Sequence, residues 1–186
     1  MEKILIVGLG NPDKTGTRHN FGIDVVRAFV ERMQEQGKLM SDWKAEAEFE
    51  SQVAKVAVVG GEVVCLFPAT YMNDSGRAVA KYIGYFHITL DNILVVHDEL
   101  ELPLGEIALQ AGGSARGHNG VRSLEASVGS PAFERLRLGI GRPTGEEAID
   151  RYVLEPFRDE EQLGVATVIP LAADKILAFT VRRLQG

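Results

Sequence analysis

Residues 3–9 form a continuous apolar, β-branched run that is closed at once by Gly10, Asn11 and Pro12. Such a run is typical of a buried strand that ends in a turn. A second run of this kind covers residues 92–97. Strands that are apolar along their whole length are usually covered by helices on both faces. This feature therefore favours an α/β fold with a sheet at its centre.

Helical patterns alternate with these strands. Apolar residues spaced three or four positions apart from Val26 to Met33 predict a first helix, which should end near Gly37. A second helix is expected after Asn73, which is one of three candidate N-cap residues. Two more helices are expected, over about 118–128 and 160–184. Pro170 lies inside the last of these and predicts a kink or a break there.

The remaining strands are shorter. Two runs separated by Gly60-Gly61 predict a hairpin, and a further strand precedes the small residues of 111–117. These three strands are expected over about 52–59, 62–67 and 105–110. The hairpin makes the expected sheet mixed rather than purely parallel.

A strand is also expected where Leu136, Leu138 and Ile140 alternate with Arg135 and Arg137. Period two places both arginines on the same side of this strand, opposite its aliphatic face. We therefore expect the two guanidinium groups on an outward face.

The length of 186 residues suits one domain, and 45% of them are hydrophobic, which is a normal balance for a globular protein. We expect a single α/β domain over residues 1–186, built on a mixed, twisted β-sheet flanked by helices. The continuous apolar runs are far too short to span a bilayer, and no secretory leader opens the sequence. Because Cys65 is the only cysteine, an intramolecular disulfide is excluded. A cytoplasmic protein without membrane contact is expected.

Charge is spread unevenly along the chain. The formal net charge of −6 argues against tight non-specific binding of nucleic acid by the whole surface. However, residues 108–142 carry five arginines against two glutamates, whereas residues 146–161 carry seven acids against two bases. A local basic site for an anionic substrate is therefore compatible with the composition.

Polar residues follow the two continuous apolar runs. Asn11 comes after the first run, and the second run ends in His97, Asp98 and Glu99. In α/β sheets, ligands bind beyond the carboxyl ends of the strands. His19 lies just before the first helix, only a short loop after Asn11. We expect these side chains to converge on one crevice.

Other chemistries fit these residues less well. Gly8 and Gly10 follow a strand as in a dinucleotide fingerprint, but its third glycine would fall on Asp13. A glycine-rich turn explains this pattern without a nicotinamide or flavin. Ser114 lacks the surroundings of a nucleophile elbow, and Cys65 is expected to be a buried hydrophobic residue.

A metal site has no signature in the sequence. The four histidines, at positions 19, 87, 97 and 118, form no helical pair with ligand spacing. A site built from His19, His97 and Asp98 nevertheless stays open. A His–Asp pair offers a second chemistry, because a neutral imidazole takes a proton from water when a carboxylate holds its other nitrogen. His19 with Asp98 meets this need, and His97 or His118 with Asp98 would in principle meet it too.

Five short motifs follow one another along the chain. They are Gly8–Pro12 with Thr17–Asn20, then Thr70–Gly76, His97–Pro103, Gly117–Gly120 and Arg135–Gly141. In this order they resemble the motifs of bacterial peptidyl-tRNA hydrolase, and they span most of the chain. The resemblance implies a monomeric α/β enzyme that needs no metal and no cofactor. It would cleave the ester between a peptide and the 3′ ribose of tRNA.

The resemblance also implies roles for single residues. The catalytic base falls on His19, and the aspartate that orients it falls on Asp98. The asparagines that position the peptide, the terminal nucleotide and the attacking water fall on Asn11, Asn73 and Asn119. An amide N–H near the carbonyl would also stabilise the oxyanion. Met72 would either contact the peptide or pack in the core.

A phosphate-binding group is implied as well. Arg137 matches a residue that grips the 5′ phosphate of tRNA, and Arg135 on the same face is expected to contribute. The chain departs from the family pattern in three places. The loop Asp13–Gly16 is shorter, Gln110 replaces a lysine of the phosphate clamp, and the glycine-rich segment that ends at Arg116 is bulkier. We expect Arg116 to supply the missing positive charge.

Two classes of function follow. The first is hydrolysis of peptidyl-tRNA by water that His19 activates, with the acceptor stem, 3′ end and peptide of the substrate as the binding partner. The alternative is a catalytically weak or inactive RNA-binding relative, which the shorter loop and Gln110 favour and the intact set of polar residues opposes. A metal-dependent hydrolase of a small ester is a distant third. No stable protein partner is expected.

Overall fold

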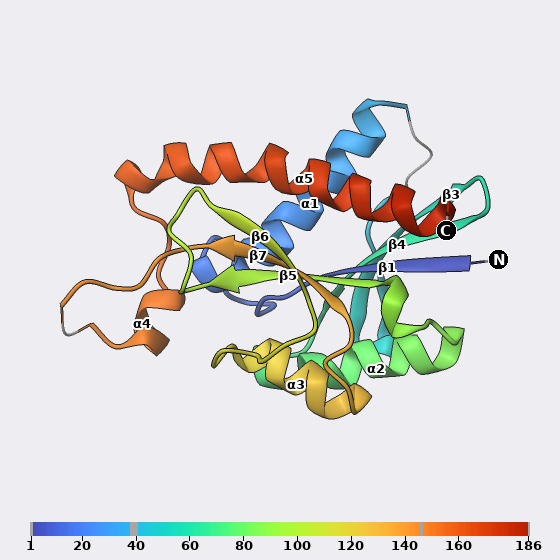
Figure 1. Ribbon diagram of the computed structural model, residues 1–186, viewed down its shortest axis with the longest axis horizontal. Helices are drawn as coiled ribbons and strands as arrows, with labels where there is room; N and C mark the ends of the chain where they lie inside the picture. The colour runs from blue at the N-terminus through green and yellow to red at the C-terminus, as the bar shows by residue number, and fades with distance from the viewer. Residues whose placement is uncertain (1, 38–40, 146, 186) are drawn as a thin grey trace.

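The two continuous apolar runs are neighbouring strands at the centre of a seven-stranded sheet (Figure 1). The computed structural model describes residues 2–37, 41–145 and 147–185, so the domain limits expected at residues 1 and 186 lie outside the described residues. In the sheet the strands follow the order β2-β3-β4-β1-β5-β7-β6. Their bounds are β1 Glu2–Gly8, β2 Lys44–Glu46, β3 Ser51–Val58, β4 Gly61–Pro68, β5 Ile93–Glu99, β6 Ile107–Ala111 and β7 Glu134–Gly139.

The sheet is mixed, as the hairpin predicted. The central strands β4, β1, β5 and β7 run parallel, whereas β2, β3 and β6 join the edges in antiparallel pairing. In the hairpin, Val58 pairs with Gly61, so the turn lies at Val59 and Gly60, one residue earlier than expected. The predicted α/β fold with a mixed sheet is confirmed. The strand β2 was not predicted, because three residues are too few to show a pattern.

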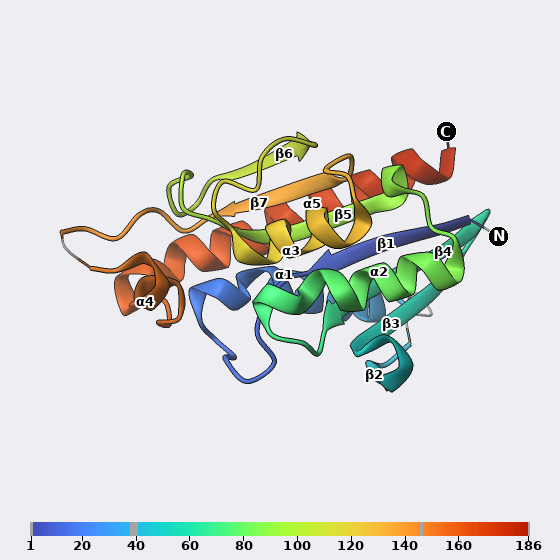
Figure 2. The same cartoon turned by 90° about the horizontal axis from the view of Figure 1, so that it is seen from below.

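Helices cover both faces of the sheet. Their bounds are α1 Phe21–Glu35, α2 Ser75–Phe86, α3 Asn119–Val128, α4 Ile149–Val153 and α5 Gln162–Gln185. Figures 1 and 2 show α1 and α5 on one face and α2 and α3 on the other. The break expected at Pro170 is absent, since α5 continues through this residue. Pro170 is exposed, and so is Ala166, whose carbonyl group loses its helical partner to the proline and faces water instead.

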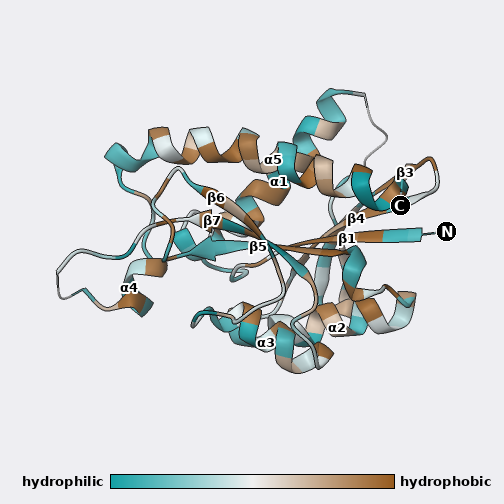
Figure 3. Cartoon of the chain, in the orientation of Figure 1, coloured by the Kyte–Doolittle hydropathy of each residue, from teal (hydrophilic) through white to brown (hydrophobic). Residues whose placement is uncertain are grey.

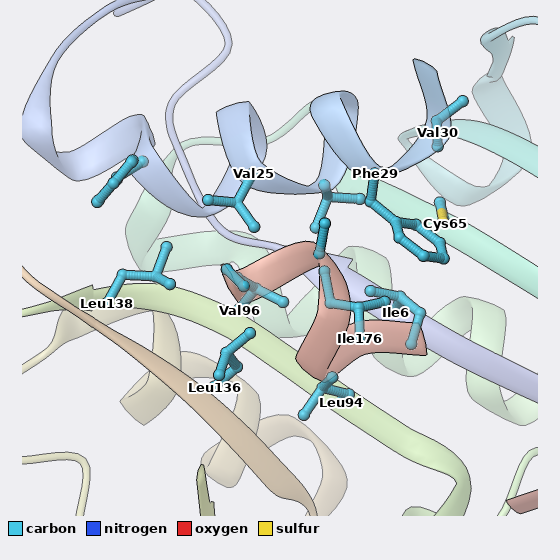
Figure 4. Close-up of a cluster of buried hydrophobic side chains, with 14 of the residues drawn as sticks. Ile6, Val25, Phe29, Val30, Cys65, Leu94, Val96, Leu136, Leu138 and Ile176 are labelled. Atoms are coloured by element: carbon cyan, nitrogen blue, oxygen red, sulfur yellow. The ribbon is translucent and has the colours of Figure 1, made fainter. Parts of the chain in front are cut away.

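Period two explains why the central strands are apolar throughout. Ile4 and Ile6 of β1 point to the core under α1 and α5, while Leu5 and Val7 point to the core under α2 and α3. Figure 4 shows the first core, where Ile6 lies among side chains from α1, α5 and the neighbouring strands. Cys65 belongs to this core, as expected, and burial raises the pKa of its thiol. Figure 3 shows the resulting contrast between the hydrophobic central strands and the hydrophilic stretches of α2 and α3.

One described helix is long and apolar enough to cross a membrane, by length and composition alone. This segment, Asp159–Gln185, contains α5. Polar and charged residues interrupt this helix, so it contains no long continuous apolar run. Its residues Val168, Ala172, Ile176 and Phe179 are buried in the core under α1. A third of its most apolar window is buried, and Leu163, Leu171 and Val181 are exposed.

Candidate active site

The expected site residues meet at the carboxyl edge of the parallel strands. β1 leads into Asn11, and β4 leads into Met72 and Asn73 in a short 3-10 turn before α2. Asp98 is the penultimate residue of β5, and Asn119 is the first residue of α3. Parallel strands end at the same edge of a sheet, so residues far apart in the sequence become neighbours here.

Glycines bring His19 close to the end of β5. His19 lies in the 3-10 turn η1 (Arg18–Asn20), directly before α1. At Gly22, a Cβ would overlap the carbonyl oxygen of Val96, and at Gly8 it would lie 2.9 Å from the carbonyl oxygen of Gly22. Any larger residue would therefore push α1 away from β1 and β5. This close approach lets η1 reach the end of the sheet.

Reciprocal hydrogen bonds fix the loop after β1 to η1. Oδ1 of Asn20 accepts the backbone N–H of Asn11 at 2.9 Å, and Nδ2 of Asn20 donates to the carbonyl oxygen of Asn11 at 2.8 Å. The short loop Asp13–Gly16 closes between these two points, and Gly16 adopts a φ of +78°. The loop is thus held to η1, which carries His19.

Arg18 anchors the other side of η1. Its side chain is fully buried, with the guanidinium 4.1 Å from the ring centroid of Tyr152. It pairs with Glu161 at 2.6 Å and donates to the carbonyl oxygen of Pro156 at 2.9 Å. A buried charge is tolerated when it is paired and hydrogen-bonded in this way. Arg18 thus ties η1 to α4 and to the segment before α5.

Asp98 lies between two imidazoles. Nδ1 of His19 lies 3.0 Å from both carboxylate oxygens of Asp98, and Nε2 of His118 lies 2.9 Å from Oδ1. Nδ1 of His118 accepts the backbone N–H of Val121 at 3.3 Å, so the proton of a neutral His118 is on Nε2. Asp98 therefore accepts one N–H from each imidazole. The nitrogen of His19 that remains for a substrate or a water molecule is Nε2.

Asp98 and His19 shift each other's pKa. Burial alone would raise the pKa of Asp98, but the charges and hydrogen bonds of His19 and His118 hold it well below its ordinary value. Burial alone would lower the pKa of His19, yet the Asp98 carboxylate, with a smaller contribution from Asp150, raises it above the ordinary value of 6.5. Asp98 is therefore charged at neutral pH. His19 is a stronger base than a free imidazole, which suits proton transfer from water.

His97 supports the cluster without joining the carboxylate. Its Nδ1 contacts the carbonyl oxygen of Asp98 at 2.7 Å, and its ring packs edge-on against His118 with 4.7 Å between centroids. Burial, together with His118, lowers the pKa of His97 to about 3, so this ring is neutral at physiological pH. The pairing of His97 with the Asp98 carboxylate, which the sequence left open, is not formed.

A pocket of about 360 Å³ contains five of the six residues that the resemblance gave to catalysis and substrate binding. Its lining consists of Asn11, His19, Tyr71, Met72, Asn73, Asn119, Asp150, Val153 and Leu154. Asp98, the sixth residue, lines an adjoining hollow of about 50 Å³ with His19, His118 and Arg116. A third hollow, of about 390 Å³, extends past Asn73 and Asn119 to Arg122. Together they form a continuous set of neighbouring depressions around His19.

The amide of Asn11 has a fixed orientation. Its Oδ1 accepts the backbone N–H of Met72 at 2.8 Å, which leaves Nδ2 as the free donor. Met72 is 3% exposed and packs in the core under α2 and α3 while it also lines the pocket. Both roles considered for Met72 are therefore compatible with its position. A Cβ at Gly120 would overlap its sulfur, so this glycine allows α3 to approach.

Asn73 is not the N-cap of α2. This helix begins at Ser75, and the capping position falls on Asp74, whose side chain makes no capping hydrogen bond. Asn73 lies one residue earlier, in the 3-10 turn, and its exposed side chain lines the pocket. Because of this 3-10 turn, the N-cap position of α2 falls on Asp74, and Asn73 keeps only the place in the pocket.

The prediction that Arg135 and Arg137 lie on an outward face is wrong, because both side chains are buried. Arg135 is 1% exposed and Arg137 is 8% exposed. Nε of Arg137 donates to Glu99 at 2.8 Å. Arg135 donates to the carbonyl oxygens of Gly112 at 2.6 Å and Ser114 at 2.9 Å. Period two separates the arginines from the aliphatic core, but it does not reveal that the chain after β6 binds Arg135 or that Glu99 binds Arg137.

Arg116 is the exposed member of the three expected phosphate ligands. It lines the hollow that also contains His19 and Asp98, and its φ of +48° places it in the left-handed region. Gln110, which replaces a lysine of the family pattern, donates to the carbonyl oxygen of Gly112 at 2.9 Å. Gln110 and Arg135 therefore both bind the segment after β6, which contains Arg116.

Two groups of the site go beyond the sequence prediction. The sequence left the pairing of His118 with Asp98 open, as one of three. Asp150 lines both hollows next to His19 and lies in α4, a helix of five residues that carries no periodic signal. The acidic stretch 146–161 was the only sequence signal that pointed to it.

The cluster also has the composition of a metal site. His19, Asp98 and His118 each offer one ligand atom, and these atoms lie within 4.8 Å of one another. However, the contact of Val121 places a proton on Nε2 of His118, and Nδ1 of His19 lies at hydrogen-bond distance from Asp98. A metal would need these nitrogens unprotonated. The geometry favours a hydrogen-bonded cluster.

Comparisons with known proteins identify the family of the chain. A family model described as peptidyl-tRNA hydrolase matches residues 5–185. The peptidyl-tRNA hydrolase of Solidesulfovibrio magneticus is 42% identical over 94% of this chain and 86% of its own, and that of Halalkalibacterium halodurans is 38% identical over 95% and 92%. The crystal structure of the Acinetobacter baumannii peptidyl-tRNA hydrolase has a TM-score of 0.87 and 33% identity, over 98% of this chain and 90% of that one. The resemblance is confirmed: the chain belongs to the peptidyl-tRNA hydrolase family.

Proposed function

We propose that this protein hydrolyses the ester bond of peptidyl-tRNA, which releases the peptide and free tRNA. The observation that supports this most directly is the His19–Asp98 pair, at 3.0 Å, beside a pocket lined by Asn11, Asn73 and Asn119. Membership of the family supports the same substrate. The catalytically inactive alternative would not require a buried carboxylate that orients an imidazole toward a pocket.

His19 acts as the base in this proposal. Nε2 of His19 takes a proton from water as the water oxygen attacks the ester carbonyl carbon. Asp98 holds the Nδ1 proton and stabilises the imidazolium that forms. When the tetrahedral intermediate collapses, the bond from carbon to the 3′ oxygen breaks. That oxygen takes the proton from His19, which gives a 3′ hydroxyl and a peptide carboxylic acid. The acid then loses its proton to bulk water and becomes a carboxylate.

Asparagine amides bind the substrate around this centre. Asn11 is the best oriented donor toward the developing oxyanion, because its Oδ1 is held by Met72 and its Nδ2 is free. Asn73 and Asn119 are exposed along the same pocket and offer both donors and acceptors to the peptide and the terminal ribose. Amides do this without adding a charge that would change the pKa of His19.

The tRNA lies, in this proposal, on the side of the pocket that carries Arg116. Its exposed guanidinium is available to a phosphate, whereas Arg137 would first have to leave Glu99. Arg135 supports the same segment from below and makes no direct contact with phosphate. We propose that the protein acts as a cytoplasmic monomer, as the resemblance to the family implies.

A comparison of two substrates tests the function. Purified protein is incubated with N-acetyl-aminoacyl-tRNA and with the same aminoacyl-tRNA that has a free amino group. Selective release of tRNA from the N-blocked ester supports the proposed enzyme. Binding of both substrates without cleavage would support the RNA-binding alternative and overturn the proposal.

A further inference from the structure

A second large cavity lies beside the proposed catalytic pocket. Its volume is about 470 Å³, and Asn11 lines both spaces. Its walls come from α1, from the end of β4 with the residue that follows it, and from the segment before β2, which contribute Ile23, Arg27, Trp43, Phe67 and Ala69. The hydrolysis described above uses none of these five side chains.

Aromatic rings form one wall of this cavity. The rings of Trp43 and Phe67 lie 4.5 Å apart between centroids, at an angle of 47°. The guanidinium of Arg27 lies over the ring of Phe67, 4.9 Å from its centroid. Phe67 is only 7% exposed, so an apolar side chain that entered the cavity would remove from water mainly the half-buried ring of Trp43.

Charge indicates which part of the substrate would reach this cavity. Arg122 carries the one charge among the residues that line the hollow beside Asn73 and Asn119, on the α3 side of the pocket, so an anionic nucleic acid is favoured there. The cavity beyond Asn11 has one cation and one anion in its walls, Arg27 and Glu31, and so offers no net attraction to phosphate. The two ends of the proposed substrate therefore have chemically different destinations on either side of His19.

We propose that the cavity lined by Trp43 and Phe67 is a subsite for a side chain of the peptide, upstream of the esterified residue. It selects an aromatic or large aliphatic side chain over a small or acidic one. The peptide leaves His19, passes Asn11 and places this side chain between the rings and α1. This inference rests on the proposed function, since it concerns the peptide of that substrate.

Defined substrates test the subsite. The value of kcat/KM is measured for N-acetyl-alanyl-tRNA, and for N-acetyl-dipeptidyl- and N-acetyl-tripeptidyl-tRNA that carry Phe, Ala or Asp at each upstream position. We expect Phe to exceed Ala by about tenfold at one upstream position. In Trp43→Ala and in Ala69→Phe, whose added ring fills the cavity, this ratio should fall toward one.

Two controls keep the outcomes separate. Tyr85→Ala removes an exposed aromatic ring from α2 and should leave the Phe-to-Ala ratio unchanged. Because Trp43 packs against the core and its removal can weaken the fold, Ala69→Phe provides the independent variant. The subsite is refuted if wild type shows no preference at any upstream position, or if the preference persists in Ala69→Phe. Failure to cleave N-acetyl-alanyl-tRNA would instead refute the proposed function.

Fluorescence gives a readout without turnover. Trp43 is the only tryptophan of the chain, so its emission reports on this cavity alone. A 3′-amino-3′-deoxyadenosine that carries N-acetyl-Phe-Ala in amide linkage should change the emission, whereas the N-acetyl-Ala analogue should not. Equal responses to the two analogues, or none to either at saturation, would contradict the subsite.

Discussion

The central residue of the site is an imidazole whose basicity is set by a buried carboxylate. Asp98 accepts N–H groups from both His19 and His118, and the pKa values of Asp98 and His19 move in opposite directions as a result. The motif spacing suggested the pair, but only the fold shows that a second imidazole completes the coordination of the carboxylate. His118 therefore positions Asp98 as Asp98 positions His19.

The rate should depend on pH through this pair. Because the base must be neutral, kcat/KM should fall as the pH drops through the pKa of His19, which lies above 6.5. Asp98→Asn removes the charge that raises this pKa, so the acidic limb should move to lower pH and the plateau rate should also fall. The pH–rate profiles of both proteins check this, and an acidic limb that Asp98→Asn leaves in place would count against His19 as the titrating group.

A smaller shift should follow from Asp150, which raises the pKa of His19 without touching it through a hydrogen bond. Asp150→Asn should move the acidic limb in the same direction as Asp98→Asn, but less far. Asp174→Asn, on α5 and paired with Arg32, serves as the control and should not move it. Identical profiles for Asp150→Asn and wild type would remove Asp150 from the account.

At the scale of elements, the site depends on how closely α1 approaches the sheet. Gly22 packs so tightly against β5 that an added methyl group would overlap the carbonyl oxygen of Val96. Gly84 of α2 is also helical, but it has open space around it. The two glycines provide a matched pair for testing the approach.

Gly22→Ala should therefore destabilise the protein by about 1–3 kcal/mol and lower kcat, since η1 moves with α1. Gly84→Ala should be neutral or stabilise by up to about 1 kcal/mol, because alanine costs less entropy in a helix. Denaturant unfolding and steady-state kinetics on both variants measure these effects. If Gly22→Ala behaved like Gly84→Ala, the close approach would not be what positions His19.

The segment after β6 depends on Arg135 in a similar way. Arg135→Met leaves the carbonyl oxygen of Ser114 without its donor and that of Gly112 with Gln110 alone, so residues 112–117 should exchange amide hydrogens faster. KM should rise more than kcat falls, because this segment carries Arg116 rather than the base. Hydrogen exchange and kinetics test this against Arg77→Met, an exposed arginine of α2, which should change neither. Unchanged exchange over 112–117 in Arg135→Met would show that the anchor is not needed.

At the scale of the whole molecule, the hydrophobic pattern of the sequence predicted the central strands better than it predicted which segments cover the sheet. The apolar runs at β1 and β5 fixed the central strands, because strands buried on both faces leave a signal in every residue. The environment of Arg135 and Arg137 was mispredicted, since alternation reports which residues share a face and not what lies over it. Helix α4 and the pairing of His118 with Asp98 depend on tertiary contacts that no local period records.

Metal removal tests the chemistry of the assembled site. The ring nitrogens of His19 and His118 that face Asp98 are engaged in hydrogen bonds to its carboxylate. Dialysis against EDTA should therefore leave kcat/KM for N-acetyl-aminoacyl-tRNA unchanged. Turnover that EDTA abolishes and Zn²⁺ restores would instead make His19, Asp98 and His118 metal ligands.

The proposal that His19 is the base is tested most directly by single-turnover hydrolysis of N-acetyl-aminoacyl-tRNA with His19→Ala. We expect the rate to fall by a factor of about 10²–10⁴, while the affinity for the substrate and the unfolding midpoint stay close to those of wild type. A rate within a few-fold of wild type would contradict the account, whatever the geometry around Asp98.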